Sequence, residues 1–320
     1  MGRMDLGQVL SGAFRIVFDN LGLYVSTMGV FIVLEGLVGA LVLVAFLSDL
    51  PDPEASPALF LANLAAPTAL AGVAGFVFTL FAVYFGIVVT DGLLRGERRG
   101  LSQAWAMGQG RFGHFAVTLL VTMLVPMLLI VGGLAPLFLT LVAGAASPEA
   151  FVAVAPLVFL SLLGAIVLAV WLYLRWYVAP VAAALEAPGA VGDRLSRSRA
   201  LTQGSRLSIL GLLVILAIVG AILSAIATAP LSLALGGESI LVQALAQQAG
   251  GVLVSLVMTP VGVAAAVLVY ASLAAPAPAP FVPVPWPAPP PSAARFCPAC
   301  GAYLAEGAAF CGACGRSVGP

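Results

Sequence analysis

The sequence predicts an all-α integral membrane protein that ends in a small cysteine-based module. Of its 320 residues, 62% are hydrophobic and 8% are charged, whereas a soluble domain carries about 25% charged residues. Six separate runs stay apolar over the roughly 20 residues that a membrane-spanning helix needs. All four cysteines lie together near the C-terminal end, in two Cys-x-x-Cys motifs. These observations exclude a soluble globular protein.

The six apolar runs account for most of the chain. We expect them to form six transmembrane helices, at residues 21–47, 69–94, 115–142, 151–179, 207–229 and 250–272. We expect the first run to stay in the mature protein, because it is too long for a signal peptide and Asp5 and Asp19 precede it. An even number of spans places both ends of the chain on the same side of the membrane.

The charged residues are distributed unevenly around these runs. The arginines cluster in the N-terminal segment, after the second run, after the fourth run and in the tail. The loops at residues 48–68, 143–150 and 230–249 contain five acidic residues and no basic one. Because arginine-rich segments are retained in the cytoplasm, we predict that both termini are cytoplasmic. The chain has no lysine and is rich in Ala, Gly and Pro, which indicates a bacterial source and hence the bacterial cytoplasmic (inner) membrane.

Three of the arginine-rich segments also contain a short, part-apolar stretch directly before a long run. These stretches lie at residues 6–15, 101–111 and 190–203. In the first, apolar and polar side chains fall on opposite faces of a helix, as in helices that lie in the membrane interface. The sequence therefore predicts three units, each an interfacial helix followed by a hairpin of two spans. The alternative is that any polar loop beside a span shows such a pattern.

The third unit carries a motif of two parts. They are Pro180-Val181-Ala182-Ala183-Ala184-Leu185-Glu186 and Arg194-Leu195-Ser196-Arg197-Ser198-Arg199-Ala200-Leu201-Thr202-Gln203-Gly204. Over roughly residues 5–273, the chain resembles the six-span bacterial membrane domain that is fused to some glycerophosphodiester phosphodiesterases. The resemblance implies a membrane-embedded protein, although the family's acidic and basic pair is missing after Tyr270. Phosphodiesterase activity does not carry over, because the chain has one histidine, His114, and no span-free stretch that could form the catalytic barrel.

Two charged residues fall inside the predicted spans and away from the polar ends of these runs. Glu35 lies near the middle of the first run and Arg175 lies inside the fourth, at similar expected depths. Because an isolated charge in the membrane is costly, Glu35 and Arg175 form a candidate intramembrane ion pair. Two structural explanations stay open: the pair locks two spans together, or Arg175 extends toward the surface among aromatic residues. Pro126 and Gly133 in the third run fit a broken transport helix and equally an ordinary membrane helix.

The C-terminal tail begins with a proline-rich stretch, residues 274–294, that predicts an extended spacer. Two Cys-x-x-Cys knuckles follow, and their cysteines are Cys297, Cys300, Cys311 and Cys314. Two such knuckles bring four thiolates to one tetrahedral Zn²⁺, which leaves no open coordination position and makes the zinc structural. The tail resembles the small zinc-ribbon module of bacterial proteins, and this resemblance implies the same four ligands. Redox-active cysteines, disulfides and iron stay open as alternatives.

The sequence thus divides into a six-span membrane domain (1–273), a proline-rich linker (274–294) and a zinc ribbon (295–320). We expect no enzymatic activity, because no nucleophile and base stand together. The expected function is to present the ribbon in the cytoplasm to a protein partner, in membrane or envelope homeostasis. Nucleic acid is not an expected partner, because Arg295 and Arg316 are too few cations to bind phosphates strongly. The alternative is a transporter or lipid-handling protein that uses Glu35 and Arg175.

Overall fold

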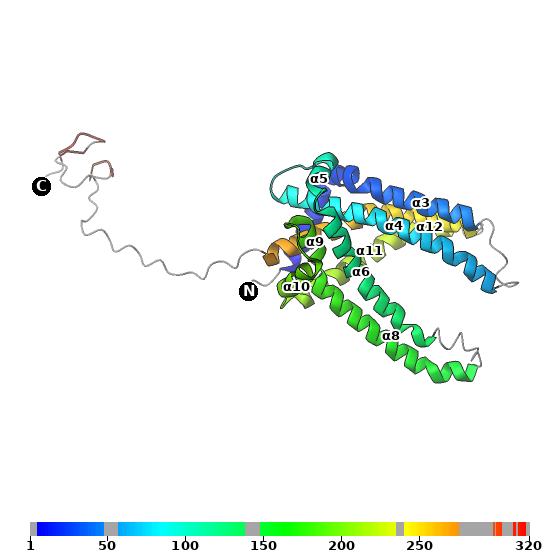
Figure 1. Ribbon diagram of the computed structural model, residues 1–320. Coiled ribbons are helices and arrows are strands. Elements are labelled where there is room, and N and C mark those ends of the chain that lie inside the picture. Colours follow the sequence, from blue (N-terminus) through cyan, green and yellow to red (C-terminus); the bar gives the residue numbers. More distant parts are fainter. Residues whose placement is uncertain are drawn as a thin grey trace. The chain divides into compact units, whose positions relative to one another are not determined.

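The computed structural model describes residues 5–47, 57–137, 148–234 and 240–274, and residues 297, 299–302, 310–311 and 313–317 of the tail. The chain divides into two compact units, of which one is formed by residues 3–275 and the other contains the tail from Pro276 onward. In the described part of the first unit, all regular secondary structure is helical (Figure 1). Six helical segments are long and apolar enough to cross a membrane, which confirms the predicted number of spans.

The long helices pair into three hairpins, and a short helix precedes each hairpin. The first hairpin contains α2 (Leu21–Tyr24), the π-helical turn η1 (Val25–Gly29), α3 (Val30–Leu47) and α4 (Pro57–Leu94). The second contains α6 (Phe112–Gly133) and α8 (Pro148–Trp176), and the third contains α11 (Arg206–Ala234) and α12 (Ile240–Ala274). The short helices are α1 (Leu6–Asp19), α5 (Leu101–Gly108) and α10 (Val191–Thr202). This order confirms the three predicted units of short helix and hairpin.

Several helix ends differ from the ends of the apolar runs. Helices α4 and α12 begin at Pro57 and Ile240, well before the predicted starts at residues 69 and 250. Hydropathy locates the apolar part of a helix, and the backbone hydrogen bonds continue beyond it. Pro126 lies inside α6 and does not break it; this helix ends at Gly133.

The fourth predicted span is divided in two near its end. Helix α8 stops at Trp176, and the short helix α9 (Ala179–Leu185) follows after Val178, whose φ of −94° and ψ of 0° leave the helical region. Pro180 stands in the first turn of α9, where its missing N–H costs no helical hydrogen bond. Every residue from Ala179 to Ala184 is buried, and α9 packs against α6 and α4. A separate buried α9 was not predicted from the sequence.

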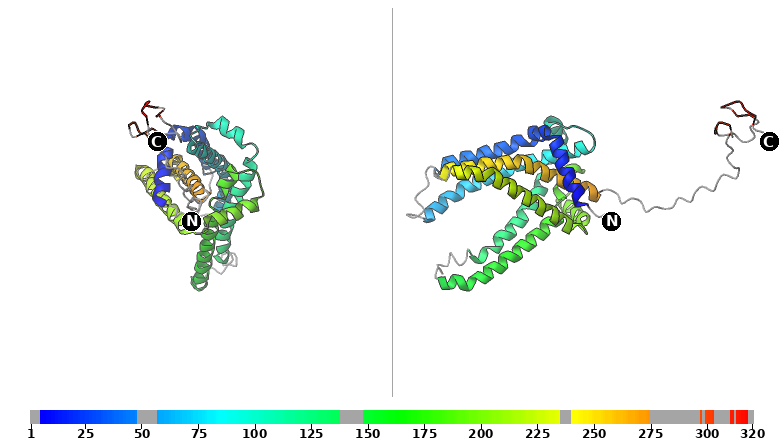
Figure 2. Two further views of the ribbon diagram at one scale, coloured as in Figure 1. Left: turned by 90° about the vertical axis from the view of Figure 1, so that its left-hand side faces the viewer. Right: turned by 180° about the vertical axis from the view of Figure 1, so that it is seen from behind.

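Helix α1 is amphipathic, as the sequence predicts, and its apolar face packs on protein. The carboxylate of Asp5 caps its first turn by accepting hydrogen bonds from the backbone N–H groups of Gly7 and Gln8. Val9, Ala13 and Val17 form its buried face. These residues belong to the main core, and α1 contacts α12 and α11. In Figure 2 (right), α1 in dark blue crosses the orange end of α12.

The core gathers where the hairpins meet around α12, which contacts α1, α3, α4, α9 and α11. Its largest fully buried side chains include Tyr24, Tyr84, Phe85 and Phe115. The Tyr24 hydroxyl lies 2.8 Å from the hydroxyl of Thr90, which itself donates to the backbone carbonyl of α4 one turn earlier. The hairpin of α6 and α8 diverges from α3, α4 and α12 at the end away from α9 and α10 (Figures 1 and 2). The short helices and the end of α8 therefore lie at the closely packed end of this unit.

Candidate functional site

The metal centre consists of two tight turns with the same hydrogen bonds. In the first, the N–H of Gly301 donates to the carbonyl of Cys297 (2.8 Å), and the N–H of Cys297 donates to that of Ala302 (2.9 Å). In the second, the equivalent bonds of Gly315 and Cys311 are both 2.8 Å long. Both glycines have a φ of +71°, a left-handed conformation that a Cβ atom would make costly. The glycine that follows each motif thus allows the chain to close a knuckle.

The four sulfur atoms form a compact group. The Sγ atoms of Cys297, Cys300, Cys311 and Cys314 lie within 4.8 Å of one another. Across the two knuckles, Cys297 lies 3.7 Å from Cys314, and Cys300 lies 3.6 Å from Cys311. A tetrahedral site with Zn–S bonds of about 2.3 Å places its sulfurs about 3.8 Å apart. The donor set and its spacing therefore fit one Zn²⁺, which would hold the two knuckles together.

The two knuckles favour the thiolate form of their first cysteine. Cys297 and Cys311 are each 2% exposed, whereas Cys300 and Cys314 are exposed. The backbone N–H of Ala299 lowers the pKa of the Cys297 thiol. In the same way, the backbone N–H of Cys314 lowers the pKa of the Cys311 thiol to about 6. Because the thiolate is the form that binds zinc, these turns prepare the site for the metal.

Glu35 lies on α3 and faces a polar cavity of about 410 Å³. The hydroxyl of Thr79 on α4 donates a hydrogen bond to Oε2 of Glu35 at 3.2 Å. Gln248, Ser255 and Thr259 on α12 also line this cavity. Helices α4 and α12, which are both long enough to span a membrane, therefore bring polar side chains to the cavity that Glu35 of α3 faces. The sequence identified Glu35 and missed these neighbours, because they lie far away along the chain.

Arg175 lies in the last turn of α8 and not in the middle of a span. Its guanidinium carbon is 4.1 Å from the centre of the Trp171 ring, which agrees with the proximity to aromatic residues considered above. The charged groups that affect Arg175 are the guanidinium groups of Arg199 and Arg206, which carry the same positive charge. No ion pair joins Arg175 to Glu35 among the residues that the structure describes. The depth expected for Arg175 counted a helix that continues to Leu185, whereas α8 ends at Trp176 and α9 is a separate helix.

Glu186 contacts side chains of two helices, and it was not identified as a site residue from the sequence. It follows α9 and accepts a hydrogen bond of 2.6 Å from the hydroxyl of Tyr270 on α12. It also forms ion pairs with Arg194 and Arg197 of α10. Glu186 therefore ties α9, α10 and α12 together. The two-part motif contains the glutamate and both arginines, and only the fold brings Tyr270 to them.

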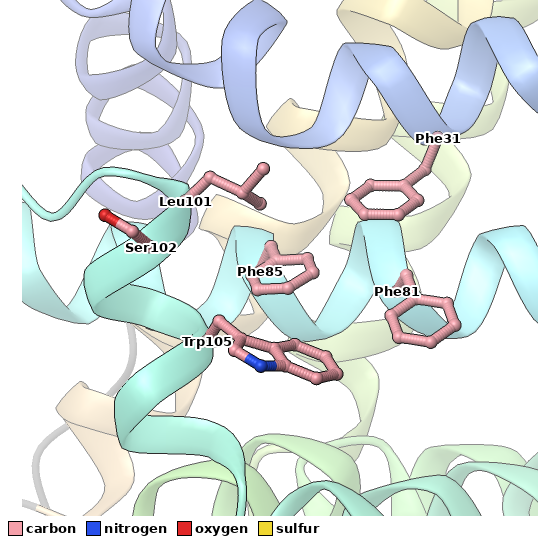
Figure 3. Close-up of a pocket in the computed structure, with 6 residues that line it drawn as sticks. All are labelled: Phe31, Phe81, Phe85, Leu101, Ser102 and Trp105. Carbon is pink, nitrogen blue, oxygen red and sulfur yellow. The ribbon is translucent and has the colours of Figure 1, made fainter.

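A further recess lies beneath α5 and has a volume of about 620 Å³ (Figure 3). Its lining residues come from α3, α4 and α5 and are Phe31, Phe81, Phe85, Leu101, Ser102 and Trp105. The three phenylalanine rings stack with centroids 5.3–6.4 Å apart. The recess contains no titratable side chain, so it can accommodate apolar groups but offers no acid or base.

Residues 296–318 match the family model of the zinc-ribbon domain, and this segment contains all four cysteines. No curated protein and no solved structure matches the chain. The family match and the clustered sulfurs confirm the predicted zinc ribbon and its structural zinc. The resemblance of residues 5–273 to the phosphodiesterase-associated membrane domain stays a prediction. The chain thus combines six membrane-length helices with a C-terminal zinc ribbon.

Proposed function

We propose that this protein is a multi-pass protein of the bacterial cytoplasmic membrane that presents its zinc ribbon in the cytoplasm to a protein partner. The observation that carries the proposal is the closed set of four cysteine sulfurs. Four thiolates fill the coordination of Zn²⁺, so the metal shapes a binding module and performs no catalysis. Six membrane-length helices support the membrane location, and the role that we propose there is in membrane or envelope homeostasis, without enzymatic activity.

The described surface of the ribbon supports a protein partner. Phe310 directly precedes Cys311, forms an isolated antiparallel bridge with Ser317, and is 66% exposed. A large aromatic side chain on a rigid turn is a typical anchor of protein interfaces. Arg316 is the one cation among the described ribbon residues, which does not favour nucleic acid.

The cytoplasmic placement rests on the distribution of arginine in the sequence. Reporter fusions test it, with one reporter that is active only outside the cytoplasm. We expect such a reporter to be active when fused after Gly144 and inactive when fused after Gly100 or at the C-terminus. The reverse pattern would contradict the proposed orientation.

In-cell crosslinking tests the partner. A photoreactive residue in place of Ser317 captures proteins that touch the ribbon in intact cells. We expect Phe310→Ala to abolish one specific crosslinked protein while the zinc content stays unchanged. Ala313→Ser, a change at an exposed position of the same knuckle, serves as the control and should keep the crosslink. The proposal fails if a chain lacking residues 275–320 restores every phenotype of a deletion strain.

The polar cavity at Glu35 favours a second candidate, a transporter or lipid-handling protein. Polar groups inside a membrane region often mark a pathway for a polar substrate. In this case Glu35 acts with Thr79 and Gln248, and Arg175 is not its partner. Glu35→Gln keeps the size of the side chain and removes its charge. If this variant fails to complement the deletion strain while the chain without residues 275–320 succeeds, the second candidate replaces the first.

A further inference from the structure

Three arginines meet where α8, α10 and α11 come together. Arg175 lies in the last turn of α8, Arg199 in the last turn of α10, and Arg206 is the first residue of α11. We call these three residues the arginine cluster. Helix α8 contacts both α10 and α11, and the positive charges of Arg199 and Arg206 oppose that of Arg175. The cluster therefore concentrates positive charge at one end of the helices.

Six other described arginines have partners that the arginine cluster lacks. Arg15, Arg95, Arg99, Arg194 and Arg197 form ion pairs with carboxylates, and Arg111 donates to the carbonyl of Leu185. The structure gives no member of the cluster an ion pair or a side-chain hydrogen bond to a described residue. The Nε atoms of Arg175 and Arg206 are buried and have no acceptor. Glu186 cannot serve them, because it already binds Arg194, Arg197 and Tyr270.

A buried N–H without an acceptor is unfavourable, and neighbouring like charges repel each other. An anion with several oxygen atoms would accept hydrogen bonds from the guanidinium groups and reduce this repulsion. The guanidinium group donates two parallel hydrogen bonds and fits phosphate oxygens in this way. The first backbone N–H groups of α11 add positive potential beside Arg206, whereas Arg175 and Arg199 lie in the last turns of α8 and α10, where the terminal carbonyl groups favour a positive charge.

Local contacts hold the arginine cluster in place. The guanidinium of Arg175 packs on Trp171 at 4.1 Å. The hydroxyl of Ser198 donates to the backbone carbonyl of Arg175 at 2.9 Å, and so it fastens α10 to α8 next to Arg199. Ser198 itself is fully buried. These contacts fix Arg175 and the junction of α8 with α10 without a ligand.

We propose that Arg175, Arg199 and Arg206 bind a phosphate group. Two sources share this chemistry: the headgroup of an anionic phospholipid and free inorganic phosphate. The site lies at the end of membrane-length helices, where a headgroup would meet it. This inference does not depend on the ribbon or on its partner.

Binding to the full-length protein in a neutral detergent tests the proposal, with native mass spectrometry and thermal unfolding as readouts. The probes are phosphatidylglycerol, phosphatidylcholine and inorganic phosphate. We expect the wild-type protein to bind phosphatidylglycerol more tightly than phosphatidylcholine. The triple variant R175Q/R199Q/R206Q should bind it on the order of 10- to 100-fold more weakly. The triple variant R15Q/R95Q/R98Q removes the same charge from exposed arginines and should bind like the wild type.

Competition separates the two sources. If inorganic phosphate displaces phosphatidylglycerol, the site accepts free phosphate. If it does not, the site is specific for the lipid headgroup. Both results support a phosphate site. Equal binding by the wild type and the cluster variant overturns the proposal, and so does an equal loss in the control variant. Should the cluster variant fail to fold, the wild type decides: no saturable binding of phosphatidylglycerol or phosphate overturns the proposal.

Discussion

Replacing Cys311 with Ser removes one of the four zinc ligands and should unfold the ribbon. Among the described residues, the apolar cluster of the ribbon consists of Cys297 and Cys311 with Ala302 packed against them. A segment as short as residues 295–320 cannot bury enough apolar surface to fold by itself. Structural zinc contributes about 10–16 kcal/mol to the folding of such modules, as much as the whole stability of an ordinary domain, about 5–15 kcal/mol. Without zinc, we expect the ribbon to be unfolded.

The bond after Arg316 reports this unfolding. In the folded ribbon the carbonyl of Arg316 accepts a hydrogen bond of 2.8 Å from the N–H of Cys311, which keeps the backbone from entering a protease. Trypsin cleaves after arginine, and mass spectrometry detects the loss of residues 317–320. We expect Cys311→Ser to raise the cleavage rate on the order of 100-fold or more, because cleavage follows the population of the open form.

Ala313→Ser is the matched control, since it adds a hydroxyl at an exposed position of the same knuckle and removes no ligand. It should keep one zinc per chain and the slow cleavage of the wild type. If Cys311→Ser is as resistant as this control, zinc does not hold the ribbon together and the reasoning is wrong.

Three further predictions concern the membrane helices and the metal. Tyr24→Phe removes a buried hydrogen bond to Thr90 and should lower the free energy of unfolding in detergent by about 1 kcal/mol; no change would show that this bond contributes nothing. Gly133→Ala places a Cβ atom 2.5 Å from the Cβ of Ala165 and 3.1 Å from the backbone carbonyl oxygen of Ser161 in α8, whereas Gly132→Ala meets nothing within 4 Å. Only the first should lower the free energy of unfolding, by about 1–3 kcal/mol, and with it the melting temperature. Protons compete with zinc for the four thiolates, so acid should release the metal. Bound zinc holds a thiolate below the pKa of about 6 that Cys311 has in the metal-free ribbon, so a colorimetric chelator should detect zinc release only below about pH 6; release at neutral pH would contradict the assignment.

The zinc ligands and the number of spans could be predicted because both depend on neighbouring residues. The spacing in each Cys-x-x-Cys motif and the glycine that follows it determine one turn, and Gly301 adopts the conformation that this turn needs. A continuous run of about 20 apolar residues forms a helix in a membrane. In a helix, the backbone N–H and C=O groups form their hydrogen bonds within the segment. The apolar face of α1 was also recognisable from its helical spacing. Whether protein or lipid covers that face depends on α12, which the spacing does not reveal.

Composition, hydropathy and motif spacing are local properties, and they are enough to identify a six-span helical protein with a four-cysteine zinc site. Which polar groups meet depends on how the helices pack. Sequence reasoning paired Glu35 with Arg175 by their depth, and the fold instead places Glu35 beside Thr79 and Arg175 against Trp171 and Ser198. The physical reason is that the end of α8 and the packing of three hairpins set these contacts. Such contacts join residues of different helices, so the local pattern of the sequence does not reveal them.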